Sequence, residues 1–129
     1  MENIQYNKYK NWLLSSDSNS RDVAINFFYH TGIADEEVDN ILISLLKTED
    51  NTENRKNLVL MFSDRVDEKF SQSLFDALQD DYWGVRGNAY KGLLKLGVSE
   101  NHELLVDYRN NDNTNHSFER FCINESAVV

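Results

Sequence analysis

Few residues in this chain have types and spacings suited to catalysis or metal binding. His102 and Glu103 are adjacent near the predicted start of a helix, whereas His30 and His116 have no spaced carboxylate or imidazole partner. A metal site needs several ligands that converge on one point. A lone His-Glu pair is therefore interpreted as structural, and no metal or cofactor is expected.

Cys122 is the only cysteine, so an intramolecular disulfide is excluded and a reducing compartment is favoured. It stands beside Phe118 and Phe121, which is typical of a packed apolar face, and no histidine is placed to activate it. The sequence also lacks a glycine-rich phosphate loop. We therefore expect no enzymatic activity.

The charge of the chain favours a basic protein partner. Thirteen lysines and arginines stand against 22 aspartates and glutamates, which gives a net charge of −9. This disfavours binding to nucleic acid or to anionic lipid. A purely solubilising role for the acids is the alternative. No stretch resembles a signal peptide or a membrane span, which predicts a cytoplasmic protein.

The elements that would position these residues are helices in repeated pairs. The chain has no proline and only five glycines, a composition that helices tolerate better than sheets with many turns. Three segments align on their arginines: "RDVAINFFYHTG" at Arg21, "RKNLVLMFSDRV" at Arg55 and "RGNAYKGLLKLG" at Arg86. An acidic, polar turn precedes each arginine. Gly32 and Gly97 are predicted to end their helices in the left-handed conformation.

A second set of helical patterns lies before these turns. In "DEEVDNILISLLK" the positions Val38, Ile41, Leu42 and Leu45 follow helical spacing. A helix is likewise predicted over 70–79, and another after Ser99 as its N-cap, with a short last helix around Phe118, Phe121 and Cys122. The result is a single all-α domain of about four helix-turn-helix units, approximately 3–32, 35–66, 69–97 and 99–124.

The third unit, "LFDALQDDYWGVRGNAYKGLLKLG", resembles a short HEAT-like repeat of the bacterial, PBS-lyase type. The resemblance rests on Leu74, Ala77, Leu78 and Asp80, then on Val85, Arg86, Ala89, Leu93 and Gly97. It implies an α-α superhelix, that is, an alpha solenoid. The resemblance also implies a ladder of turn aspartates and helix arginines: Asp80 with Arg86, Asp17 with Arg21, and Asp50 with Arg55. The turns lack the proline that this family often has there.

Related activities of this family include metal-dependent hydroxylases, bilin lyases and DNA glycosylases. A hydroxylase would need several His-Glu pairs, and a glycosylase would need a basic groove, neither of which this sequence offers. Nothing specific in the residues supports a lyase.

Two surfaces are candidates for binding a protein partner. One is the concave side lined by the second helices of the units, and the other is an acidic edge formed by the turns. Tyr82 and Trp83 stand on that edge, either as an exposed hot spot or packed between repeats. Together the surfaces give the candidate contacts Asp17, Asp22, Asn26, Tyr29, Glu49, Asp50, Glu53, Asp81, Tyr82, Trp83, Tyr90 and Lys91.

These observations predict a non-catalytic module for protein-protein interaction, monomeric before it binds. Its sharpest form is an acidic immunity protein, a toxin inhibitor that neutralises a basic bacterial toxin, for instance a nuclease. The alternative is a general adaptor that holds a peptide or helix in its concave face and depends on Tyr29, Leu60, Tyr90 and Leu94.

Overall fold

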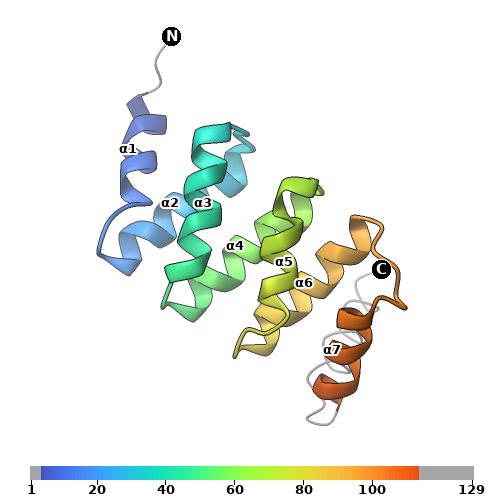
Figure 1. The fold of residues 1–129 in the computed structure, drawn as a ribbon. Coiled ribbons are helices and arrows are strands. Elements are labelled where there is room, and N and C mark those ends of the chain that lie inside the picture. The colour runs from blue at the N-terminus through green and yellow to red at the C-terminus, as the bar shows by residue number, and fades with distance from the viewer. Residues whose placement is uncertain (1–3, 114–129) are drawn as a thin grey trace. The chain divides into compact units, whose positions relative to one another are not determined.

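The computed structural model describes residues 4–113, and their regular secondary structure is entirely helical, without any strand (Figure 1). Their elements are α1 (Ile4–Trp12), α2 (Ser18–Thr31), α3 (Glu36–Thr48), α4 (Thr52–Arg65), the 3-10 turn η1 (Glu68–Phe70), α5 (Ser71–Ala77), α6 (Trp83–Lys95) and α7 (Glu103–Asn113). The prediction of an all-α protein is confirmed for this part of the chain. The predicted last helix lies outside the described residues.

Local sequence signals begin and end several of these helices. Asp17 caps α2 by accepting hydrogen bonds from the backbone N–H groups of Asn19 and Ser20, and Asp35 caps α3 through the N–H of Val38. Gly32 and Gly97 have φ of 68° and 90°, a region in which a side chain would be strained. The two predicted glycine caps are therefore confirmed.

The chain divides into two compact units, one up to Met61 and the other from Phe62 onward. In the first unit α1 packs on α2, and the ring of Tyr6 meets that of Phe28 edge to face at 5.9 Å between centroids. Leu13 and Leu42 are fully buried here. Because Leu13 comes just after α1, its burial anchors the segment that leads into α2.

In the second unit α5 packs on α6 at very short range. A Cβ at Gly92 would lie 2.6 Å from the Ser63 hydroxyl and 3.1 Å from a methyl group of Leu74. The Ser63 hydroxyl in turn donates a hydrogen bond of 2.9 Å to the carbonyl of Asn88. The small residues of α6 thus permit the close approach that the sequence predicts.

Two predicted helices begin or end elsewhere. The helix predicted over 70–79 starts as the 3-10 turn η1, after Asp67 accepts a hydrogen bond from the N–H of Lys69, and α5 then ends at Ala77. The helix predicted directly after Ser99 is preceded by a turn, in which the Ser99 hydroxyl accepts a hydrogen bond from the N–H of Asn101. As a result α7 starts at Glu103 and not directly after Ser99.

Candidate functional site

An arginine near the start of α2, α4 and α6 makes the same local hydrogen bond each time. Each guanidinium donates to the carbonyl oxygen six residues before it: Arg21 to Ser15 at 3.0 Å, Arg55 to Glu49 at 3.3 Å and Arg86 to Asp80 at 2.7 Å. These carbonyls lie in the turn that precedes the helix. The contact gives a cation near the positive end of a helix a compensating acceptor.

Arg21 additionally binds a buried carboxylate from the turn after α3. Its Nε and Nη2 donate to the two oxygens of Glu49 at 2.7 and 2.8 Å, a bidentate arrangement. The Glu49 side chain is 0% exposed and that of Arg21 is 11% exposed. Burial by itself raises the pKa of Glu49, but hydrogen bonds from Arg21 and from the N–H of Asn51 outweigh it and hold the pKa below its ordinary value.

Two further carboxylates surround this ion pair. Asp50 reaches Arg21 at 3.4 Å, yet its side chain remains 90% exposed. Asp17 accepts hydrogen bonds from the hydroxyl and backbone N–H of Ser20, and these lower the pKa of its carboxyl group. Three acids therefore lie near Arg21, while Arg55 donates to the carbonyls of Glu49 and Asp50 in the same turn. The carboxylates at these turns thus outnumber the guanidinium groups.

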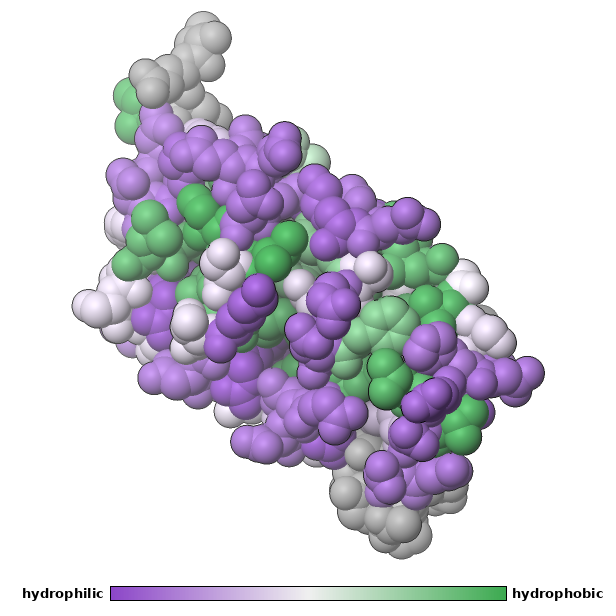
Figure 2. Space-filling view, in the orientation of Figure 1, coloured by the Kyte–Doolittle hydropathy of each residue, from purple (hydrophilic) through white to green (hydrophobic). Residues whose placement is uncertain are grey.

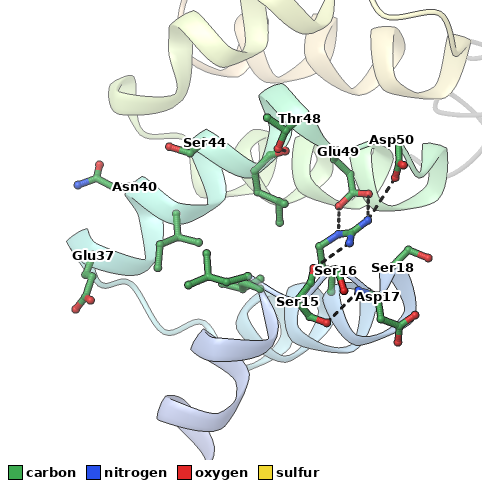
Figure 3. Close-up of a pocket in the computed structure, with 15 residues that line it drawn as sticks. Ser15, Ser16, Asp17, Ser18, Glu37, Asn40, Ser44, Thr48, Glu49 and Asp50 are labelled. Atoms are coloured by element: carbon green, nitrogen blue, oxygen red, sulfur yellow. Dashed lines mark hydrogen bonds and ion pairs between the residues drawn. The ribbon is translucent and has the colours of Figure 1, made fainter.

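A groove of about 1020 Å³ opens between α3 and the segment that joins α1 to α2. Figure 3 shows Glu37, Asn40, Ser44 and Thr48 along α3, with the residues from Ser15 to Ser18 opposite and the Arg21–Glu49 pair near one end. The apolar lining residues are Leu13, Leu14, Ile41 and Leu45. In Figure 2 hydrophobic surface is visible between α1 and α3, next to hydrophilic side chains.

The groove has leucine at its surface. The Leu14 residue is 69% exposed, directly beside the fully buried Leu13. Hydroxyl groups line both walls, from Ser15 and Ser16 on one side and from Ser44 and Thr48 on the other. The arrangement can receive an apolar side chain and offer hydrogen bonds around it.

The predicted partner contacts of the first unit are only partly at the surface. Asp17, Asp50 and Glu53 are exposed. Asp22, Asn26 and Tyr29 are half-buried along α2. Asn26 donates two hydrogen bonds of 3.0 Å to Asp22, and Tyr29 stacks on His30. The acids of the turns thus provide the accessible charge.

Two residues that were predicted to contact a partner at the surface are buried, so these two predictions are wrong. Glu49 is buried because Arg21 and the start of α4 enclose its carboxylate. Tyr90 is only 7% exposed, since its ring packs at 5.1 Å from that of Tyr108 and its hydroxyl accepts a hydrogen bond from Arg109. Neither side chain has the free surface that the prediction assumed.

The second unit holds the other aromatic candidates. Trp83 is 37% exposed and its ring lies 5.6 Å from that of Tyr82. Asp81 is exposed, whereas Lys91 is half-buried on α6. Tyr82 and Trp83 therefore contact each other and remain partly accessible.

The arginines that the family resemblance places in an Asp-Arg ladder also donate to backbone carbonyls of these turns. Arg55 donates to the carbonyls of both Glu49 and Asp50, and Arg86 donates to the carbonyl of Asp80. The Asp80 carboxylate accepts a hydrogen bond from the N–H of Tyr82. Backbone carbonyls are thus acceptors at every one of the three arginines, and Arg21 adds a glutamate.

The groove itself was not predicted from the sequence. Its walls come from the side of α3 that carries Asn40 and Ser44 and from the serine-rich segment after α1. The available signal was "LLSSDS", in which a second leucine follows the helix pattern and immediately precedes polar turn residues. Helical spacing does not assign this second leucine, Leu14, to the core, so it could have been predicted to lie at the surface.

Between residues 4 and 113 no group of three or more His, Cys, Asp or Glu side chains is arranged to hold a metal ion. His102 accepts a hydrogen bond from the N–H of Leu104 through Nδ1. His116 and Cys122 lie outside the described residues. In the same part of the chain, no helix has both the length and the apolar character needed to cross a bilayer.

Comparison of the chain with protein-family models, with curated proteins and with solved structures gives no match. The groove and the charges around it are therefore the features on which a proposed function can rest.

Proposed function

We propose that this chain is a non-catalytic protein-binding module that captures a basic protein. The observation that carries the proposal is the acidic end of the first unit, where four carboxylates, those of Asp17, Glu49, Asp50 and Glu53, outnumber the cations Arg21, Arg55 and Lys56. Charge of this kind accelerates the association of a partner of opposite sign and makes it sensitive to salt.

The distribution of roles among these acids supports binding more than chemistry. Glu49 is occupied by Arg21 and by the N–H of Asn51, and Asp17 caps a helix. Asp50 has only the long 3.4 Å contact and is almost wholly solvated. Asp50 is therefore the carboxylate that a partner's lysine or arginine can reach at the least cost, and Glu53 is exposed as well, although Lys56 lies 3.2 Å from its carboxylate.

The repeated arginine contact supports the finer form of the proposal, a solenoid of HEAT-like repeats. The same hydrogen bond to the carbonyl six residues upstream recurs at Arg21, Arg55 and Arg86. Repeats of this kind serve widely as binding scaffolds. A small acidic scaffold in the cytoplasm suits an immunity protein that covers the cationic substrate groove of a toxin.

Affinity capture with two matched variants tests this function. The tagged protein is incubated with an extract of its native cells at low salt, and bound proteins are identified by mass spectrometry. One variant carries D17N, D50N and E53Q, and the control carries D76N, E100Q and D107N on exposed residues of the second unit. Asparagine at position 17 retains a helix cap.

Both variants remove three negative charges, so they separate local from overall electrostatics. We expect the parent protein and the control to retain one basic protein that salt releases, and the first variant to lose it. A partner that is toxic when expressed alone would support the immunity form. Retention by all three proteins at high salt, or a partner that is not basic, would contradict the proposal.

A further inference from the structure

We infer that the groove between α3 and the segment from Leu13 to Ser18 binds one short extended segment of the basic partner. That segment has a large apolar side chain and, two or three residues away, a lysine or arginine. This inference rests on the proposed function and adds to it the place and the chemistry of recognition.

The apolar part of the groove explains why the bound segment carries a large apolar side chain. Leu14 is largely exposed although its neighbour Leu13 is buried, and both line the groove with Ile41 and Leu45 of α3. A leucine held at the surface of a concave site gains most when another apolar side chain covers it. An aliphatic or aromatic residue of the partner is therefore expected at this position.

The charges define which end of the groove receives the cation. At one end Asp50 is 90% exposed beside the C-terminus of α3, whose partial charge is negative, and it lies 3.4 Å from Arg21, which also binds Glu49. At the other end Glu37 already has a partner, because Lys10 of α1 lies 3.0 Å from its carboxylate. Asp35 and Glu36 also lie at that end, but they stand at the start of α3, where the partial charge of the helix is positive. A cation is therefore favoured at the Asp50 end, and the bound segment has a fixed direction.

The length of the groove sets the spacing. From Ile41 to Thr48 the helix rises about 10 Å at its usual 1.5 Å per residue. An extended chain covers that distance in about three residues. The serine and threonine hydroxyls on the two walls can donate to and accept from the main chain of such a segment.

A peptide library tests this inference directly. The immobilised protein selects from random dodecapeptides displayed on phage, and the synthetic consensus peptide is then titrated into ¹⁵N-labelled protein. We expect a consensus with one large apolar residue two or three positions from a lysine or arginine. Amide signals of Leu14, Ile41, Ser44 and Asp50 should shift most.

Variants on exposed positions provide the controls. S44R places bulk and positive charge in the groove at a residue that arginine can replace within a helix. N110R makes the same change in charge on the exposed face of α7. We expect S44R to lower the affinity for the peptide by about tenfold or more, in the range of a lost anchor contact. N110R should bind the peptide as tightly as the parent protein does.

Several results would overturn the inference. They are no enrichment, a consensus of cations alone whose shifts lie outside the groove, and a consensus that is neutral or acidic. Sedimentation velocity that shows a dimer dissociated by S44R would assign the groove to a second copy of the chain and contradict it equally.

The inference and the proposed function fail in different ways. If S44R binds the captured basic protein normally while the D17N, D50N and E53Q variant does not, the groove is wrong and the function stands. If the consensus peptide occupies the groove but no basic protein is captured, the function is wrong and the groove stands.

Discussion

Near the start of α2 and of α6 an arginine makes the same local hydrogen bond, and at Arg21 a buried glutamate is bound as well. Arg21 donates to the carbonyl of Ser15 and also holds the buried carboxylate of Glu49, 28 residues away. Arg86 donates to the carbonyl of Asp80 at 2.7 Å. The local bond depends only on the spacing of arginine and turn. The ion pair depends on a glutamate from a different turn, so it connects the start of α2 with the end of α3.

The comparison also explains where charge is available for a partner. In the first unit the guanidinium is saturated by Glu49, which leaves Asp50 exposed and only weakly held. A buried carboxylate with a bidentate partner costs a large desolvation free energy, and it survives only because its hydrogen bonds are complete. Breaking that pair should therefore be the most damaging single change among those considered.

Replacing Glu49 with alanine is expected to lower the free energy of unfolding by about 3–5 kcal/mol, the usual effect of removing one partner of a buried pair. Arg21 would keep its burial and lose its principal acceptor. Urea denaturation measures the change. E53A, at an exposed acid close by, should change stability by at most about 0.5 kcal/mol. Equal losses in the two variants would show that the ion pair is not structurally important.

Replacing Arg86 with alanine is expected to lower the free energy of unfolding by about 1–3 kcal/mol, because the charged hydrogen bond to the carbonyl of Asp80 is removed. The matched control is K95A on the same helix, whose 3.2 Å pair with Asp64 is largely solvated and contributes about 0–1 kcal/mol. Thermal unfolding of both variants is the measurement. An R86A protein as stable as the parent, or less stable than E49A, would invalidate the ranking.

The smallest expected effect is a dependence on acid pH. The pKa of Glu49 is lower in the folded state than its ordinary value of 4.5. Its contribution is therefore complete above that value and is lost as pH falls through the lower folded-state pKa. Unfolding followed from pH 7 to pH 3 should show the loss in the parent, and E49Q should show a shallower decline. Parallel curves would assign the acid sensitivity to other carboxylates.

The helical class could be predicted because periodic apolar residues and short capping signals act locally. Asp35 and Gly97 are examples, since a carboxylate at a helix start and a glycine at its end need no distant contact. The burial of Glu49 could not be predicted, because it depends on the approach of Arg21 from another turn. Tyr90 likewise becomes buried through Tyr108 and Arg109 of α7.

The groove could not be predicted from local sequence patterns, for a related reason. Leu14 and Ser44 come from different helical pairs, and only the tertiary arrangement of the first unit makes them walls of one cavity. Periodicity assigns α3 a buried face through Val38 and Leu42. It says nothing about the adjoining face that carries Ile41 and Ser44.

The most direct test of the central claim compares one acid from each unit in binding to the captured basic protein. D50K and D81K make the same change in charge at exposed turn residues, and stopped-flow mixing measures the association rate constant of each. We predict that D50K slows association by about tenfold or more, as loss of electrostatic steering does, while D81K leaves it nearly unchanged. A D81K protein slowed as much as D50K, or two variants that associate like the parent, would contradict the claim that the acidic end of the first unit receives the partner.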